Sequence, residues 1–223
     1  KNLLKSKKNN FKDKSNFKEL FLNKEVQELF KSFNSYSGNA ELRFVGGCIR
    51  KLISSENVDD IDLSTNLKPE NVIEVLKKNK INFYETGIDH GTITAVINKK
   101  SFEITSLRKD IKTDGRHAQV EYTDNWLEDA SRRDFTINAI YSDLDGNLFD
   151  PFNGRMDLNN GLIKFIGDPG TRIKEDYLRI LRYIRFFLGY SKNQHDKKTV
   201  KTIKQNLIGL KQVSKDRQLQ ELK

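Results

Sequence analysis

The hydrophobic pattern changes its period once along the chain, near Asp168, and this change limits the possible folds more than any other feature of the sequence. Over residues 38–166, short runs of strand-forming residues alternate with glycine turns and helical stretches, which predicts a mixed sheet with helices. Over residues 167–223, apolar residues recur at helical spacing, which predicts an all-helical part. Residues 1–37 are expected to form a basic segment that ends in a helix. The 223-residue chain is therefore expected to have an α+β fold.

Charge is distributed unevenly over these parts. Residues 1–20 carry seven lysines against two acids, and residues 171–223 carry fourteen Lys and Arg against five acids, whereas the stretch between them is net negative. A basic helical part is typical of polyanion binding, and an acidic middle part is suited to holding cations. Charged runs that only solvate helices are the alternative in each case.

Composition excludes several classes of protein. No run of about 18 apolar residues is present, so no membrane span is expected. The single cysteine, Cys48, excludes a disulfide framework and a cysteine-based zinc site within the chain. The lysine-rich N-terminus has no apolar signal core, and we expect a cytoplasmic protein. Since the chain has no initiator Met and ends within a helical pattern, it is expected to be part of a longer protein.

Three carboxylates fall within four residues, at Asp59, Asp60 and Asp62, among residues that otherwise favour a strand. Residues i and i+2 of a strand share a face, so Asp60 and Asp62 are predicted to point the same way. Such carboxylates repel each other unless a divalent cation lies between them, and Mg²⁺ prefers oxygen ligands. Glu103, on another predicted strand, is a candidate third catalytic carboxylate for this face. Ordinary surface acids are the alternative for all of these side chains.

Two further segments are suited to phosphates. Gly46 and Gly47 lie between a predicted strand and a helix, where glycine lets a phosphate approach the backbone. A plain tight turn is the alternative there. Arg132, Arg133 and Asp134 lie between a predicted helix and a strand, where arginine offers fork-shaped donors to phosphates and the aspartate can accept from a ribose hydroxyl. A simple Arg–Asp pair is the alternative for this segment.

Eight segments occur in the order VGGCIR, DDIDLSTN, GIDHGTIT, FEITSLR, TDGRHA, RRDFTINA, FDPFNGRMDL and EDYLRILRYIRF. From about Leu42 to Phe187 they make the chain resemble the class II tRNA nucleotidyltransferases, the CCA-adding enzymes, and their bacterial poly(A) polymerase relatives. The bacterial form of the CCA-adding enzymes is the expected closer match. The resemblance implies a DNA polymerase beta-like nucleotidyltransferase head over residues 38–166. It also implies a helical neck over residues 167–223, truncated here, and an RNA-binding role for that part.

The resemblance further implies roles for particular residues. Asp60 and Asp62 would hold two catalytic Mg²⁺ ions. The polar stretch over residues 107–122, expected to be a loop, would help to switch from C to A addition. Lys51 is a departure, because the family's G-G-x-x-R-D motif has an aspartate at this place. Nucleotide-binding roles follow for Gly46, Gly47, Arg50, Arg132, Arg133, Asp134, Asn138, Asp176, Arg179, Arg182 and Arg185.

The sequence thus predicts a template-independent RNA nucleotidyltransferase that adds C and A from CTP and ATP to the 3′ end of tRNA. A poly(A) polymerase, or an enzyme that adds only C or only A, is an alternative of the same class. A non-catalytic RNA-binding fragment is an alternative of a different class, although the intact Asp60 and Asp62 argue against it. Asp176 and Arg179, three residues apart on one predicted helical face, would read the base. An intrahelical salt bridge is the alternative for that pair.

Overall fold

The computed structural model describes residues 19–113 and 118–222, and it has the α+β fold that the hydrophobic pattern predicts. Of the basic segment and helix predicted for residues 1–37, residues 1–18 lie outside these ranges. The chain divides into two compact units, the first made of Lys1–Ser106 and Tyr141–Phe149, the second of Leu107–Ile140 and Asp150–Lys223. These units divide the chain differently from the predicted head and neck, whose boundaries stay a prediction.

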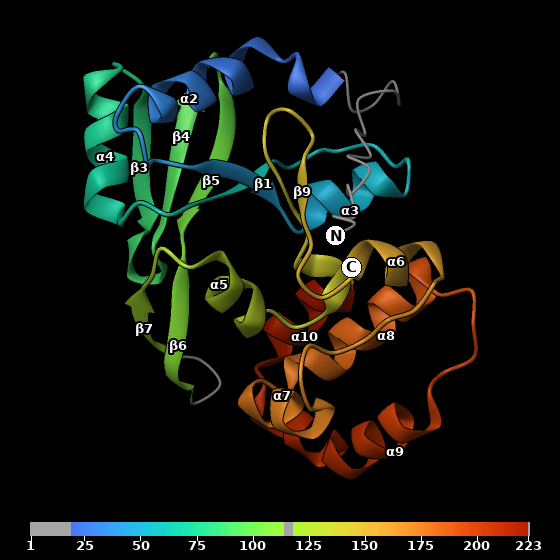
Figure 1. Cartoon of the computed structure of the whole chain (residues 1–223). Coiled ribbons are helices and arrows are strands. Elements are labelled where there is room, and N and C mark those ends of the chain that lie inside the picture. Colours follow the sequence, from blue (N-terminus) through green and yellow to red (C-terminus); the bar gives the residue numbers. More distant parts are fainter. Residues whose placement is uncertain (1–18, 114–117, 223) are drawn as a thin grey trace, which may run out of the picture. The chain divides into compact units, whose positions relative to one another are not determined.

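The first unit is built on a seven-stranded sheet with the order β3-β4-β5-β2-β1-β8-β9. The strands are β1 (Leu42–Val45), β2 (Asp62–Thr65), β3 (Asn82–Gly87), β4 (Thr92–Ile97), β5 (Lys100–Ser106), β8 (Tyr141–Ser142) and β9 (Leu148–Phe149). Neighbouring strands run antiparallel except β2 and β5, which are parallel. The helices are α2 (Lys24–Asn34), α3 (Gly47–Ile53) and α4 (Pro69–Lys78), with a 3₁₀ turn over Ile88–His90. Figure 1 shows α4 along β3 and β4, which it contacts.

In the core of the first unit, helix α2 packs on strand β1 of the sheet. Asn23 caps α2 by accepting a hydrogen bond from the amide of Val26 at 3.1 Å. From α2, the ring of Phe30 packs on that of Phe44 in β1, with centroids 4.9 Å apart, and both residues are buried. Burying a phenylalanine side chain stabilises the fold by about 1.5–3 kcal/mol. The strand that precedes the two glycines is therefore anchored in the core.

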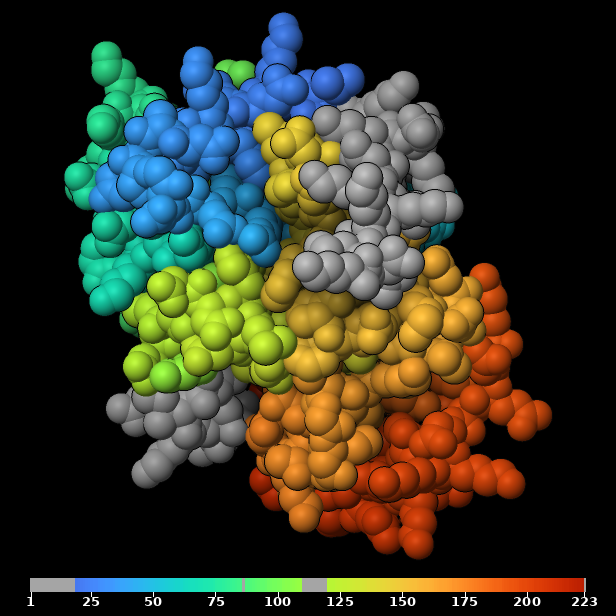
Figure 2. Space-filling view, in the orientation of Figure 1, coloured from blue at the N-terminus to red at the C-terminus, as the bar shows by residue number. Residues whose placement is uncertain are grey.

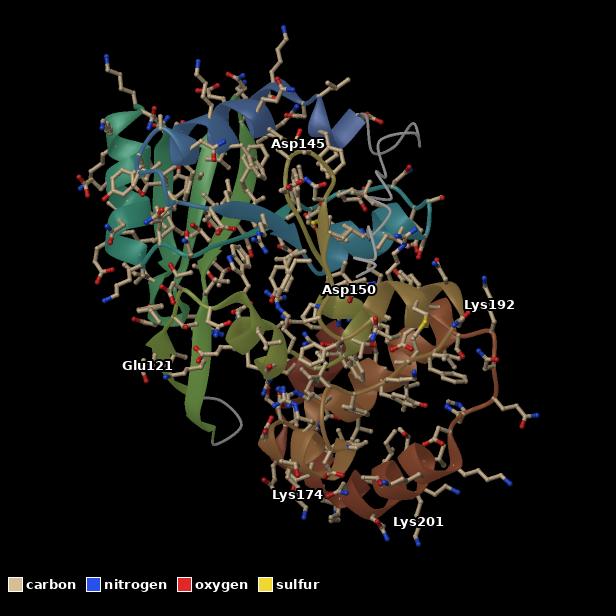
Figure 3. All side chains as sticks on the ribbon, in the orientation of Figure 1. Glu121, Asp145, Asp150, Lys174, Lys192 and Lys201 are labelled. Atoms are coloured by element: carbon tan, nitrogen blue, oxygen red, sulfur yellow. The ribbon has the colours of Figure 1, made fainter. Side chains whose placement is uncertain are left out.

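Two tight turns close hairpins in this unit. Between β4 and β5, Asn98 and Lys99 both have positive φ, 50° and 67°, as a two-residue hairpin turn requires. Between β8 and β9, Gly146 has a φ of 79°, so the turn predicted at Asp145-Gly146 is confirmed. The amide of Asp145, labelled in Figure 3, donates to Asp143 at 2.9 Å.

The second unit begins with a hairpin and continues as helices. Its elements are β6 (Arg108–Thr113), β7 (Ala118–Tyr122), α5 (Trp126–Arg132), a 3₁₀ turn over Thr136–Asn138, α6 (Gly154–Asn159), α7 (Pro169–Glu175), α8 (Leu178–Tyr190), α9 (Lys197–Asn206), a 3₁₀ turn over Leu207–Gln212, and α10 (Lys215–Leu222). Its core is aromatic, with Phe165 stacked on Tyr183 of α8 at 5.9 Å and packed against Phe135 at 4.6 Å. The helical pattern predicted from Asp168 onward is thus confirmed.

Three local predictions are wrong. The stretch over residues 107–122, predicted to be a loop, forms the β6–β7 hairpin. The strand after Asp134 is replaced by a 3₁₀ turn and an isolated bridge from Phe135 to Phe165. The helix predicted across Asp176 is interrupted, because Asp176 ends α7 in an extended conformation and α8 begins at Leu178, whose amide donates to the Asp176 side chain at 3.1 Å.

The strand expected to hold Asp60 is also shorter than predicted, since β2 begins only at Asp62. The last pair in register between β1 and β2 is Phe44 with Leu63. Beyond Val45 the chain turns at Gly46 into α3, so residues before Asp62 have no β1 partner.

Within residues 19–113 and 118–222, no helix combines the length and the apolar character that are required to cross a bilayer.

Candidate active site

Two of the predicted carboxylates lie on neighbouring strands of the first unit. Asp62, the first residue of β2, is in register with Glu103 of the parallel strand β5. The next pair in register, Leu63 and Ile104, is 1% and 0% exposed and anchors both strands in the core. Because side chains alternate between the faces of a strand, Asp62 and Glu103 share the opposite face. This placement agrees with the expectation that Glu103 lies on the same face as Asp62.

Asp60 is exposed and precedes β2, so strand alternation does not align it with Asp62. The neighbouring Asp59 is ion-paired with Lys51 of α3, at 3.1 Å from Oδ2 to Nζ. Lys51, which departs from the family motif, therefore ties the segment before β2 to α3. Within the part of the chain that the structure describes, no group of three or more His, Cys, Asp or Glu side chains is placed to hold a metal. The metal-ligand roles of Asp60 and Asp62 stay a prediction.

The two glycines bring the start of α3 close to Asp62. Gly46 has a φ of 65°, a conformation that favours glycine. A Cβ atom placed on Gly47 would lie 3.8 Å from Asp62 Oδ2 and 3.9 Å from Arg50 Nη2. Arg50 is itself buried. Gly47, Arg50 and Asp62, all predicted site residues, thus lie together in the first unit.

The one cysteine is not a nucleophile in this structure. The Cys48 thiol is buried and donates to the carbonyl oxygen of Val45 at 3.2 Å and to that of Asp62 at 3.5 Å. Burial, with the nearby Asp62 charge, raises the pKa of the Cys48 thiol to about 12. Since the thiolate is the reactive form, Cys48 stays unreactive at neutral pH.

In the second unit, the predicted arginines are held by a carboxylate that the sequence analysis missed. Asp129, on α5 and fully buried, accepts from Nε and Nη2 of Arg132 at 2.9 and 2.7 Å. It also accepts from Nε and Nη2 of Arg133 at 3.3 and 3.1 Å. Arg172 of α7 donates to the carbonyl oxygen of Arg133 at 2.7 Å and to that of Arg132. The i, i+3 and i, i+4 spacings of Asp129 to the arginines were a readable signal.

Asp134 is buried and accepts three hydrogen bonds. These come from the amide of Phe135 at 2.8 Å, Nδ2 of Asn138 at 2.9 Å and Nη1 of Arg182 at 3.0 Å. Burial alone would raise the pKa of the Asp134 carboxyl, but the Arg182 charge and the hydrogen bonds lower it below its usual range. Asp134 therefore stays ionised at neutral pH. Three predicted site residues, Asp134, Asn138 and Arg182, are thus joined directly.

Asp176 and Arg179 do not share a helical face, and the salt bridge considered between them is replaced by other partners. Asp176 lies between α7 and α8 and pairs with Arg217 of α10 at 2.9 Å from Oδ2 to Nη2. Arg179 Nη1 pairs with Glu175 at 2.5 Å and donates to the carbonyl oxygen of Arg172 at 2.8 Å. Each side chain is therefore oriented by a partner of opposite charge.

Arg182 and Arg185 of α8 converge on Glu221 of α10. Glu221 is buried and accepts from Arg185 Nε at 2.9 Å, from Arg185 Nη2 at 2.6 Å and from Arg182 Nε at 3.3 Å. Sequence reasoning missed Glu221 and Arg217, because they lie 36 to 41 residues away from these partners and no local pattern marks them.

The profile of the family described as the poly(A) polymerase head domain matches residues 42–164, more than half of the chain. The chain belongs to the poly(A) polymerase head-domain family. The mitochondrial CCA tRNA nucleotidyltransferase 1 of Homo sapiens is 45% identical over 188 residues, which cover 83% of this chain and 43% of that protein. The CCA-adding enzyme of Lactobacillus helveticus is 41% identical over 179 residues, covering 79% of this chain and 44% of that protein.

Two solved structures have a similar fold. The CCA-adding enzyme of Bacillus stearothermophilus in complex with CTP superposes with a TM-score of 0.78 at 29% identity, over 94% of this chain and 48% of that one. A tRNA nucleotidyltransferase complexed with a primer tRNA and an incoming ATP analogue has a TM-score of 0.68 at 27% identity, over 87% of this chain and 54% of that one.

The match to the poly(A) polymerase head-domain family ends before α7, so α7 to α10 lie outside it. The chain spans less than half the length of the curated relatives described above. The expected closer match to the bacterial form is not supported, since the human mitochondrial protein has the higher identity of the two.

Proposed function

We propose that the chain is part of a template-independent RNA nucleotidyltransferase that adds C and A, from CTP and ATP, to the 3′ end of tRNA. The main observation behind this proposal is that Asp62 is in register with Glu103. Asp62 lies beside the start of α3, where Gly47 has no side chain. It leaves two carboxylates on one face next to backbone that a phosphate can approach. Membership of the poly(A) polymerase head-domain family supports the same reading.

The donor set fits magnesium. Mg²⁺ is usually bound by one or two carboxylates, with water and substrate phosphates in its other positions, and Asp62 and Glu103 offer carboxylate oxygens on one face. We assign Asp60 and Asp62 as ligands of two Mg²⁺ ions and Glu103 as a further catalytic carboxylate. Mg²⁺ bound there would supply Lewis-acid chemistry, at the attacking 3′-hydroxyl and at the leaving pyrophosphate.

The residues of the second unit would bind the incoming nucleotide. Arg132 and Arg133, both fixed by Asp129, would donate to the triphosphate through their guanidinium forks. A carboxylate has about four acceptor positions, and Asp134 uses three of them for protein donors. About one position is left for a ribose hydroxyl. Asn138 and Arg182 would act with Asp134, since both donate to it.

Asp176 and Arg179 would select the base. The Watson–Crick edges of C and A each offer an amine donor beside a ring-nitrogen acceptor, whereas U and G offer a ring N–H beside a carbonyl. Asp176, which only accepts, and Arg179, which only donates, together fit C and A. A wrong base leaves buried polar groups unpaired, at a cost of about 1–3 kcal/mol for each.

Competition among all four nucleotides tests the base-reading roles. Asp176→Ala is expected to raise the incorporation of UTP or GTP relative to CTP and ATP, or to lower the use of CTP and ATP. Unchanged rate and unchanged preference in both Asp176→Ala and Arg179→Ala would remove this assignment and leave the main proposal standing.

The main proposal is tested with tRNA that lacks its CCA end, Mg²⁺ and one labelled nucleotide at a time. Extension by CTP and then by ATP is the expected result, and Asp62→Ala is the matched inactive control. Long A tails would instead identify a poly(A) polymerase, which the name of the family keeps as the second candidate. Addition of only C or only A would narrow the activity. No incorporation would contradict the proposal and favour an RNA-binding fragment.

The cytoplasmic location expected from the sequence stays a prediction. The vertebrate relatives with 44–45% identity carry mitochondrial names. Imaging of the tagged protein with a mitochondrial marker decides between the two locations.

A further inference from the structure

Helix α9 concentrates positive charge on the second unit. It contains Lys197, Lys198, Lys201 and Lys204 and no acid between its first and last residues. Like charges three or four residues apart destabilise a helix, so this spacing carries a cost that neutral polar residues would avoid. All four lysines are exposed, and the helix forms part of the surface drawn in orange-red in Figure 2.

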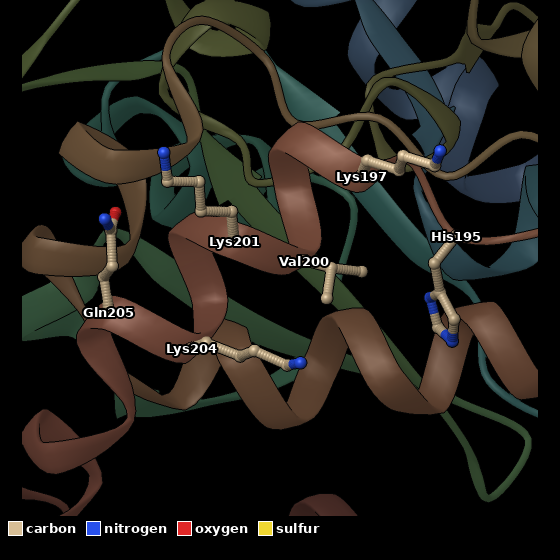
Figure 4. A pocket seen from close by; sticks show the side chains of 6 residues that line it. All are labelled: His195, Lys197, Val200, Lys201, Lys204 and Gln205. Atoms are coloured by element: carbon tan, nitrogen blue, oxygen red, sulfur yellow. The ribbon is translucent and has the colours of Figure 1, made fainter.

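Three of these lysines line one cavity. The cavity has a volume of about 510 Å³, and we call it the α9 lysine pocket. Its lining residues are His195, Lys197, Val200, Lys201, Lys204 and Gln205. In Figure 4, His195 and Lys197 lie at one end of the pocket, and Lys201 and Gln205 at the other. None of the lining residues belongs to the predicted nucleotide site.

The three lysines that line the pocket differ from Lys198 in their charged neighbours. Within residues 19–113 and 118–222, Lys197, Lys201 and Lys204 form no ion pair. Lys198, which does not line the pocket, lies instead near the carboxylates of Asp168 and Asp196 and lowers the pKa of both, although hydrogen bonds from Thr199 and Thr171 contribute more. Within the residues that the structure describes, the three pocket lysines thus have no carboxylate at ion-pair distance, whereas Lys198 lies near two carboxylates.

His195 gives the pocket a fixed aromatic end. Its ring stacks on that of Phe187 with centroids 3.4 Å apart, and its Nδ1 lies 3.3 Å from the hydroxyl of Tyr183. Val200 and the lysine stems add apolar surface. Cationic ends beside an aromatic ring are the combination that nucleic-acid strands recognise, through phosphates and through sugars or bases.

We propose that the α9 lysine pocket is a contact site for the phosphate backbone of the RNA substrate, separate from the residues that bind the nucleotide. The inference rests on the proposed function for the identity of the polyanion. Lys197 and Lys204 are seven residues apart, which is about 10 Å along a helix at 1.5 Å per residue. At this spacing the three lysines can contact more than one phosphate of an RNA strand.

The test compares two triple variants of equal charge. Lys197→Gln/Lys201→Gln/Lys204→Gln removes the pocket charges, and Lys77→Gln/Lys78→Gln/Lys80→Gln removes three exposed lysines in or beside α4 of the first unit. The dissociation constant for tRNA without its CCA end is measured between about 50 and 200 mM salt. Each lost phosphate contact reduces the slope of log affinity against log salt by about 0.7–0.9, so the pocket variant is expected to lose roughly two to three units. The α4 variant is expected to keep most of the slope.

Comparing two single variants tests whether the pocket lysines, rather than the charge of α9 as a whole, contact RNA. Lys201→Gln is expected to weaken RNA binding several-fold at low salt, whereas Lys198→Gln, in the same helix and with the same charge change, has a smaller effect. Equal effects of both would overturn the role of the pocket, as would a slope in the pocket variant equal to that of the α4 variant.

Failure of this inference is distinguishable from failure of the proposed function. If the pocket variant incorporates CTP and ATP normally and its salt slope is unchanged, the RNA-contact role of the pocket is overturned and the proposed activity is not. If the pocket variant has a flattened salt slope but the unmodified chain incorporates no nucleotide, the RNA-contact role of the pocket stands and the proposed activity is overturned. A weaker affinity for CTP in the pocket variant, without RNA present, would assign the lysines to the nucleotide and so overturn the RNA contact.

Discussion

Replacing Asp129 with asparagine tests whether one buried carboxylate orients both arginines of the candidate nucleotide site. Asp129 is fully buried and pairs with Arg132 at 2.7 Å and with Arg133 at 3.1 Å. It also accepts from the amide of Arg108, the first residue of β6, at 3.4 Å. The asparagine keeps the shape of the side chain but removes its charge and turns one acceptor into a donor. At least one guanidinium then faces an N–H group.

The cost follows from burial. Removing one partner of a buried ion pair destabilises a protein by about 3–5 kcal/mol. The side chains of Arg132 and Arg133 are 16% and 18% exposed, so some hydration recovers part of this loss. We therefore expect a decrease of roughly 2–4 kcal/mol in the free energy of unfolding. At about 2–4 °C per kcal/mol for a chain of this size, Tm falls by roughly 5–15 °C.

Urea unfolding and calorimetric titration with CTP measure the two consequences. Affinity for CTP is expected to fall because the arginines lose their fixed orientation. Glu128→Gln is the matched control, since Glu128 lies on the same helix and its side chain accepts from Thr123 Oγ1 at 2.5 Å near the surface. That variant should lose less than about 1 kcal/mol and keep its CTP affinity. If Asp129→Asn loses no more than the control does, the reasoning about its burial is refuted.

Three further predictions are open to direct measurement. Asp62→Asn should abolish incorporation while Tm shifts by less than about 2 °C, since the proposed Mg²⁺ ligand is lost and no core packing changes; substantial turnover would refute the proposed role. The lowered pKa of Asp134 means that its stabilisation is present above an unfolded pKa of about 3.9 and is lost as pH falls through the folded pKa, so urea unfolding of Asp134→Asn should depend less on pH below about 4 than that of wild type. Gly154→Ala should cost more than about 2 kcal/mol in thermal melting, because the new Cβ would lie 2.0 Å from the carbonyl oxygen of Thr136, whereas Gly189→Ala, with open space around it, should be neutral or stabilising.

The α+β fold and the strand face that Asp62 and Glu103 occupy were accessible from sequence for a physical reason. The alternation of apolar and polar residues fixes which face of a strand is buried, and both Leu63 and Ile104 obey it. Once those two side chains point into the core, Asp62 and Glu103 must point away from it. The same logic failed at Asp60. Alternation predicts a face only within a strand, and β2 begins at Asp62 because its partner β1 supplies no pairing residue beyond that point. Where β1 ends cannot be read from the residues around Asp60.

The ion-pair network of the second unit was not accessible in this way. Glu221 reaches Arg185 across 36 residues, and Arg217 reaches Asp176 across 41. Such pairs depend on how α10 packs on α8, which the periodicity of either helix leaves undetermined. Asp129 differs, because its arginines lie within one turn of the chain. A buried carboxylate three and four residues before two arginines is a pattern that can be sought in other sequences.

The partners of Asp176 and Arg179 bear on how a protein can replace a template. Had the two formed the salt bridge that their spacing suggests, each base would have to break that bridge before it could be read. Instead Arg217 holds one oxygen of Asp176, the amide of Leu178 holds the other, and Glu175 holds Arg179. Because the orienting partners are separate, both side chains are fixed in advance and each keeps hydrogen-bonding capacity for a base edge. In the proposed base-reading role, a carboxylate and a guanidinium that are held apart in this way would test a base without first rearranging.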